Sequence, residues 1–261
     1  MKTLLVPVDG SQFAERALPV ATNLASRLGA DVQIVTTAWE GREEVAERYL
    51  ASLVALFGHD AVATQVVSGD NAAGAILHAA SGVADATVCM ATHGRGGFRW
   101  AVLGSVAEAV VRESTTPVVL VGRHARPAPL DAAEIVVCWD GGPASLSVVR
   151  PACAWAQALG VGVHFVRVAH PLDLDPRDHH DDALAQAVEI VRDHGIAVGR
   201  ALLNDAHFAG GIADFATTHN SAMIAMATHA RTGIERVGLG SVTMGVVGCA
   251  PCPVLVARTG G

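Results

Sequence analysis

Lysine, tyrosine and long apolar runs are scarce in this chain of 261 residues. Lys2 is the only lysine, aromatic residues make up 4% of the chain, and the formal net charge is -7. Proteins that bind nucleic acid usually carry clustered positive charge, so this composition argues against a nucleic-acid partner. No apolar run approaches the ~20 residues that cross a bilayer, so we expect no membrane partner.

Cysteine is also limited, because the five cysteines are irregularly spaced and odd in number. This pattern argues against a disulfide framework. Cys249 and Cys252 form a Cys-x-x-Cys pair, but no thioredoxin-like pattern precedes them, which favours a structural role. A short strand pattern follows Met1-Lys2 directly, where a secretory leader would show a longer apolar stretch. We therefore expect a cytoplasmic protein.

One stretch of the chain occurs twice. Residues 90–106 begin Met-Ala-Thr-His and end Leu-Gly-Ser-Val, and residues 226–242 repeat this frame without a gap. Each copy has the pattern of a strand end, a loop of small residues and a helix that opens at Gly-Ser. The repeat predicts two domains, 1–123 and 132–261, joined by a proline-containing linker at 124–131.

Both halves show the alternation of strand and helix patterns that is typical of α/β proteins. Ser11, for example, is expected to cap a helix that runs to about Leu28 and stops at Gly29. We predict two tandem doubly wound parallel sheets of five strands each, in the order 3-2-1-4-5, a Rossmann-like fold. Ligands of such sheets lie beyond the carboxyl ends of the strands, where the strand order reverses.

The repeated loop has the chemistry of an anion site. Gly94, Gly96 and Gly97 allow close approach to the backbone, and Gly104-Ser105 leaves the first N–H groups of a helix without intrahelical partners. These N–H groups and the helix dipole attract negative charge. The pattern lacks the Gly-Lys-Ser/Thr of a Walker A loop, and it follows a fourth strand, so it is no dinucleotide fingerprint either. A plain helix start is the alternative, which the second copy weakens.

These motifs together resemble the universal stress protein family in its tandem two-domain form. The matching segments are Val6–Ser11, Gly69-Asp70, Met90–Gly97, Leu103–Ala107, Pro117–Val121 and Cys249–Val256. The resemblance implies an adenine-nucleotide-binding fold that holds ATP, or ADP or AMP, with Mg²⁺ accompanying the phosphates. It also implies an intramolecular pseudo-dimer of the two domains, and it leaves a homodimer of the chain open.

The resemblance carries specific nucleotide contacts onto this sequence. In the first domain they are Pro7, Val8, Asp9, Thr37, Met90, Ala91, Thr92, His93, Gly94, Arg95, Gly104, Ser105 and Val106. In the second they are Asp140, Val168, Met226, Ala227, His229, Gly240, Ser241 and Val242.

The two copies depart unequally from the family pattern. Ala91 replaces one motif glycine in the first domain, whereas Ala227 and Ala230 replace both loop glycines in the second. An alanine forced to positive φ costs about 1–2 kcal/mol. We therefore rank the first site above the second.

Three functions remain open at this point. The leading hypothesis is a nucleotide-dependent regulatory or binding module in stress adaptation. The second is a slow ATPase, although no general base or carboxylate cluster joins the loop, so we expect no dedicated enzyme and at most weak ATP hydrolysis. The third is a nucleotide-free assembly module. Asp178–Asp182 contains two histidines, but its pattern favours a solvated helix start over a metal site, so we predict no metal ligands and no catalytic residues.

Overall fold

The computed structural model describes residues 2–57, 62–69, 71–93, 103–141, 145–171, 182–228 and 240–258. The chain divides into two compact units, Met1–Arg123 and His124–Gly261. Within the predicted linker, the backbone N–H of Arg126 donates to Pro251 O at 2.9 Å, inside the second unit. No helix in these described ranges is long and apolar enough to cross a bilayer.

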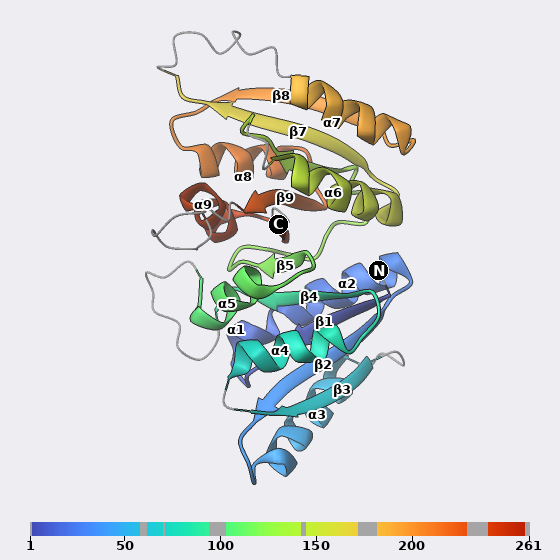
Figure 1. The fold of residues 1–261 in the computed structure, drawn as a ribbon, viewed down its shortest axis with the longest axis vertical. Coiled ribbons are helices and arrows are strands. Elements are labelled where there is room, and N and C mark those ends of the chain that lie inside the picture. The colour runs from blue at the N-terminus through green and yellow to red at the C-terminus, as the bar shows by residue number, and fades with distance from the viewer. Residues whose placement is uncertain are drawn as a thin grey trace. The chain divides into compact units, whose positions relative to one another are not determined.

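The first unit contains one parallel sheet in the order β3-β2-β1-β4-β5. Figure 1 shows α4 in front of this sheet and α2 behind it. The elements are β1 (Thr3–Pro7), α1 (Gln12–Glu15), α2 (Ala17–Leu28), β2 (Asp31–Ala38), α3 (Glu43–Phe57), β3 (Val62–Ser68), α4 (Ala72–Ser81), β4 (Ala86–Ala91), α5 (Ser105–Glu113) and β5 (Val118–Val121).

The second unit repeats this topology in the order β8-β7-β6-β9-β10, again with parallel pairing. The strand order predicted for each half is therefore confirmed. The elements are β6 (Glu134–Cys138), α6 (Leu146–Leu159), β7 (Gly162–Ala169), α7 (Asp182–Asp193), β8 (Val198–Asn204), α8 (Phe208–Thr218), β9 (Met223–Thr228), α9 (Ser241–Cys249) and β10 (Val254–Arg258).

Buried apolar strands form the core of each unit. Leu4, Leu5 and Val6 of β1 are fully buried, as are Ile135 and Val136 of β6. Strands that are covered on both faces need such continuous apolar runs rather than an alternating pattern. The central strands of each sheet are thus held rigidly, and their carboxyl ends are fixed points from which the following loops emerge.

The helix expected to run from Ser11 to Leu28 is divided in the structure. Ser11 caps α1 by accepting the Ala14 N–H, and α2 restarts after Arg16. Pro19 explains the division, because a proline lacks an N–H and is tolerated only in the first turn of a helix. Gly29 ends α2 with φ at +60°, as the sequence predicts.

Candidate nucleotide site at the carboxyl ends of the strands

In the first unit the predicted residues gather where three neighbouring strands end. Val8 follows β1, and its N–H donates to Val35 O of β2 at 2.8 Å. The buried Thr36 hydroxyl returns a hydrogen bond to Val8 O, also at 2.8 Å. On the other side of β1, β4 ends with Met90 and Ala91, which are buried. These residues therefore meet at the carboxyl ends of β2, β1 and β4, the edge at which the strand order predicts a ligand site.

Asp9 is held in a defined orientation at this edge. Its Oδ1 accepts from the Ser11 N–H at 3.0 Å and from the Ser11 hydroxyl at 2.6 Å. Gly10 between them adopts φ +82°, a left-handed conformation that favours glycine. The turn thus positions the carboxylate before any ligand arrives.

In the first unit, residues at the start and at the end of the repeated loop are hydrogen-bonded to each other. Gly104 donates its N–H to Thr92 O at 2.6 Å, and the Thr92 N–H donates to Val121 O of β5. The Thr92 hydroxyl and His93 Nδ1 lie 3.0 Å apart. A side chain at Gly104 would approach Thr92 O to 3.2 Å, so this closure favours glycine. Gly94 and Arg95 lie outside the described residues.

Helix α5 begins at Gly104 without a side-chain cap. Ser105 takes the first helical position, so its hydroxyl does not cap the helix, and both Ser105 and Val106 are exposed. The first N–H groups of a helix have no intrahelical acceptors, and the helix dipole concentrates positive potential there. This end of α5 can receive an anionic group.

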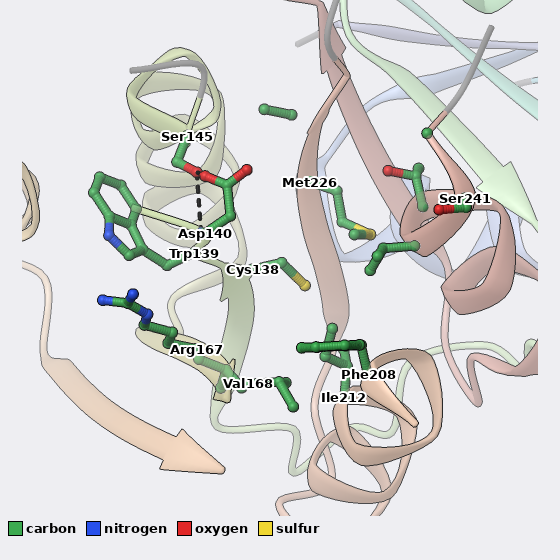
Figure 2. A pocket seen from close by; sticks show the side chains of 15 residues that line it. Cys138, Trp139, Asp140, Ser145, Arg167, Val168, Phe208, Ile212, Met226 and Ser241 are labelled. Carbon is green, nitrogen blue, oxygen red and sulfur yellow. Dashed lines mark hydrogen bonds between the residues drawn. The ribbon is translucent and has the colours of Figure 1, made fainter. Parts of the chain in front are cut away.

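In the second unit, the corresponding edge encloses a cavity of about 410 Å³ (Figure 2). This volume falls within the range of roughly 300–1,000 Å³ that is typical of small-molecule sites. Seven of the eight predicted second-domain residues line it, and the eighth, His229, lies outside the described residues. The full lining is Cys138, Trp139, Asp140, Ser145, Val166, Arg167, Val168, Phe208, Ile212, Met226, Ala227, Gly240, Ser241, Val242 and Thr243.

The polar side chains of this cavity come from the turn after β6, from Arg167 of β7 and from the start of α9. Figure 2 shows Asp140 and Ser145 at one side, joined by a hydrogen bond, and Ser241 at the other. The Ser145 hydroxyl donates to Asp140 Oδ1, and Gly141 has φ +82°, the value that Gly10 has in the first unit. Helix α9 starts at Gly240, again without a side-chain cap, and leaves Ser241 and Val242 exposed. Both units therefore offer an aspartate that is followed by a glycine at φ +82° and held by a serine, together with an uncapped helix start.

The rest of the cavity wall is mainly apolar. Trp139 is only 3% exposed, and its ring meets the ring of Phe165 edge-on at 5.7 Å, as expected for a core residue. Burial raises the pKa of the Cys138 thiol above its usual range, so this thiol is neutral at pH 7 and adds to the apolar surface. Such a wall suits a ligand that carries both an apolar ring and an anionic tail.

The sequence prediction missed several lining residues, notably Cys138, Arg167 and Phe208. Arg167 and Phe208 occupy the positions of Thr36 and Ala72 in the first unit, so the repeat gave no signal for them. Cys138 occupies the position of Pro7 in the first unit. Their position at the cavity depends on how α8 and β7 pack, which residue patterns do not reveal.

The candidates for metal binding and redox chemistry in the described part of the chain are its His, Cys, Asp and Glu side chains. Among those residues, no three His, Cys, Asp or Glu side chains gather closely enough to hold a metal ion. Residues 178–181 of the Asp178–Asp182 segment lie outside the described residues. Cys249 and Cys252 are both free thiols, and Cys249 Sγ donates to Gly245 O and Ala209 O.

Comparisons with known proteins agree with the repeated architecture. The model of the Universal stress protein family matches residues 33–122 and 133–258. Universal stress protein Rv1996 of Mycobacterium tuberculosis is 28% identical over 303 residues, which cover 98% of this chain and 94% of that protein.

Solved structures show the same fold. The crystal structure of a universal stress protein from Archaeoglobus fulgidus covers 99% of this chain and 98% of its own, with a TM-score of 0.74 and 19% identity. A universal stress protein from the same organism was solved in complex with dAMP. It covers 49% of this chain and 99% of its own, with 24% identity and a TM-score of 0.38, and the dAMP is a property of that protein.

Proposed function

The chain belongs to the universal stress protein family, and from that premise we propose that it binds adenine nucleotide at the carboxyl ends of its central strands. The observation that carries the proposal is the cavity of about 410 Å³, which is lined by Asp140, Met226 and the open start of α9. An apolar wall for the base, a carboxylate for ribose hydroxyls and free helix N–H groups for phosphates are the three features that a nucleotide needs.

We propose that the first unit also holds a nucleotide. It has an acidic turn at Asp9, a loop closed by the Gly104 N–H, and an exposed Ser105 at an uncapped helix start. Its loop keeps Gly94 where the second copy has Ala230, whereas the other motif glycine is replaced in both copies, by Ala91 and Ala227. We expect the first site to bind ATP more tightly than the second, because glycine tolerates a left-handed loop without strain.

The bound species is proposed to be ATP, ADP or AMP, and Mg²⁺ would arrive with the phosphates. The described residues supply no cluster of three metal ligands, so the ion would be held chiefly by phosphate oxygens. The chain's own residues would orient the nucleotide: Asp9 and Asp140 at the ribose, and the starts of α5 and α9 at the phosphates.

Nucleotide occupancy would serve regulation in stress adaptation rather than rapid turnover. Asp9 and Asp140 each accept hydrogen bonds from a nearby serine, which supports a role in binding. The five cysteines are free thiols, as suits the reducing cytoplasm in which we propose that the protein works.

The test is isothermal titration of the full chain with ATP, ADP, AMP and cyclic AMP. Ser105→Glu and Ser241→Glu place a negative charge at the start of α5 or α9, where both serines are exposed. A carboxylate there stabilises a helix by about 0.3–1 kcal/mol, so the fold is retained while phosphate is repelled. Each variant should weaken its own site about tenfold or more and leave the other site intact.

Two outcomes would count against the proposal. The first is the absence of saturable binding of all four nucleotides by the wild-type chain. The second is unchanged nucleotide binding in the chain that carries both Ser105→Glu and Ser241→Glu, which would show that the nucleotide binds elsewhere. Circular dichroism of every variant checks that the helices remain folded.

A further inference from the structure

The first residue of α8 differs from the first residue of its counterpart in the first unit, and it lines the cavity. Helices α4 and α8 are counterparts, and their opening residues are Ala72 and Phe208. Ile76 and Ile212 follow at equal distance in the two helices and are both buried. The register of the two helices is therefore the same, and the phenylalanine is an addition specific to the second unit.

Phe208 lies at the wall of the cavity with part of its ring open. The side chain is 36% exposed and lines the cavity together with Val168, Ile212 and Met226. Figure 2 shows it extending from the start of α8 towards Val168, with Met226 on another side of the space. Because Phe208 is partly exposed where it lines the cavity, part of its surface is available to a ligand.

The helix that carries Phe208 is held firmly against α9. The Cβ of Ala209 lies so close to Gly245 that a Cβ added there would sit 2.8 Å from it. Cys249 Sγ of α9 also donates to Ala209 O at 3.4 Å. The residue after Phe208 is thus fixed by the same helix whose open start faces the cavity at Ser241.

We propose that Phe208 is a stacking wall that makes the second cavity selective for ligands with a planar heterocyclic ring. This inference rests on the proposed nucleotide function and specifies how the second site recognises its ligand. The ring of the ligand lies on the face of Phe208, and its anionic group lies at the start of α9. The first site lacks this wall, because Ala72 has no ring to offer.

The energetic consequence is a site whose affinity depends on the ring as much as on the phosphates. Stacking of a base on an aromatic side chain is large enough to change affinity by about 5- to 100-fold. This gain offsets part of the loss expected from Ala227 and Ala230. Affinity at the second site therefore depends more strongly on the ring of the ligand than affinity at the first site does.

The experiment uses the full chain with Ser105→Glu, so that the second cavity dominates binding. Three probes are titrated calorimetrically: ATP, adenosine, which has no phosphate, and inorganic tripolyphosphate, which has no ring. The variants are Phe208→Ala, Phe208→Leu and Phe208→Trp. Phe13→Ala is the matched control, because Phe13 is a phenylalanine of α1 in the other unit and is 53% exposed.

We expect Phe208→Ala to weaken ATP and adenosine by about 5- to 100-fold and to leave tripolyphosphate unchanged. Phe208→Leu should also lose affinity for both ring-containing probes, since it keeps an apolar side chain without an aromatic face. Phe208→Trp should retain the affinity for ATP and adenosine. Phe13→Ala should bind all three probes as tightly as the parent chain does.

Unchanged ATP binding in Phe208→Ala would overturn the inference. An equal loss for tripolyphosphate would also overturn it, because Phe208 would then act by positioning α9. Absence of ATP binding to this cavity in the parent chain would be a different result, since that would refute the proposed function itself at this cavity.

Discussion

The hydroxyl of Tyr49 connects three segments beside the first site. It donates from α3 to Glu15 Oε1 of α1 at 2.9 Å, and it also interacts with the backbone of Gly10, next to Asp9. Burial, then the hydrogen bond and negative charge of Glu15, raise the pKa of this phenol well above its usual value near ~10. The hydroxyl can donate to Glu15 only while it is protonated.

We predict that this single tyrosine resists ionisation in the folded protein. The folded pKa lies above the unfolded one, so the stabilisation is complete below pH ~10 and is lost as the pH rises above that value. Ultraviolet absorbance of the phenolate, followed with and without denaturant, measures both pKa values. The stability of Tyr49→Phe should fall less steeply in this alkaline range, and identical titration of folded and unfolded chains would contradict the prediction.

At the scale of elements, the contact between α8 and α9 depends on two small residues. Gly245 faces Ala209 so closely that any larger side chain would push the helices apart. Gly210, one residue further along α8, has only the His207 Cβ at 3.7 Å from an added Cβ, which is an ordinary contact. Two helical glycines thus differ in what surrounds them.

This difference predicts opposite effects of the same substitution. Gly210→Ala should raise the free energy of unfolding by about 0.5–1 kcal/mol, because alanine favours helix and restricts the unfolded chain. Gly245→Ala gains the same propensity but overpacks the contact, so it should be less stable than Gly210→Ala by at least about 1 kcal/mol. Urea unfolding of both variants measures the difference, and equal stabilities would show that the helices adjust freely.

The elements also show how far the sequence alone could predict this molecule. The strand order followed from the alternation of apolar runs and helix patterns, because parallel strands with right-handed crossovers allow few topologies. The division at Arg16 was missed, although Pro19 was visible, since a proline is compatible with either a kink or a restart. The position of Phe208 at the cavity was missed because its counterpart in the first half is Ala72, and because the packing of α8 against α9 is not visible in the residue pattern.

At the scale of the molecule, each unit has a core of its own and a buried thiol that can report on it. Cys89 lies within β4 of the first unit, and Cys252 lies just before β10 of the second. Burial raises the pKa of each to about 12, so both thiols are almost entirely protonated at pH 8. They should react with an alkylating reagent only when their own unit opens.

We therefore predict that a core substitution accelerates labelling mainly in its own unit. Leu5→Ala in β1 should destabilise the first unit by about 2–5 kcal/mol and speed the reaction of Cys89 more than that of Cys252. Val136→Ala at the matching position of β6 should do the reverse. Mass spectrometry of peptides after pulsed alkylation distinguishes the two thiols. Equal acceleration of both in either variant would show that the units open together.

The acidic residue, the glycine at φ +82° that follows it and the uncapped helix start recur in both units, while the first residue of the helices α4 and α8 has diverged from Ala72 to Phe208. Two sites of unequal affinity fill one after the other as ligand concentration rises. Under the proposed function, the singly occupied chain would predominate over an intermediate range of nucleotide concentration. It would therefore respond over a wider span of nucleotide concentration than a protein with two identical sites.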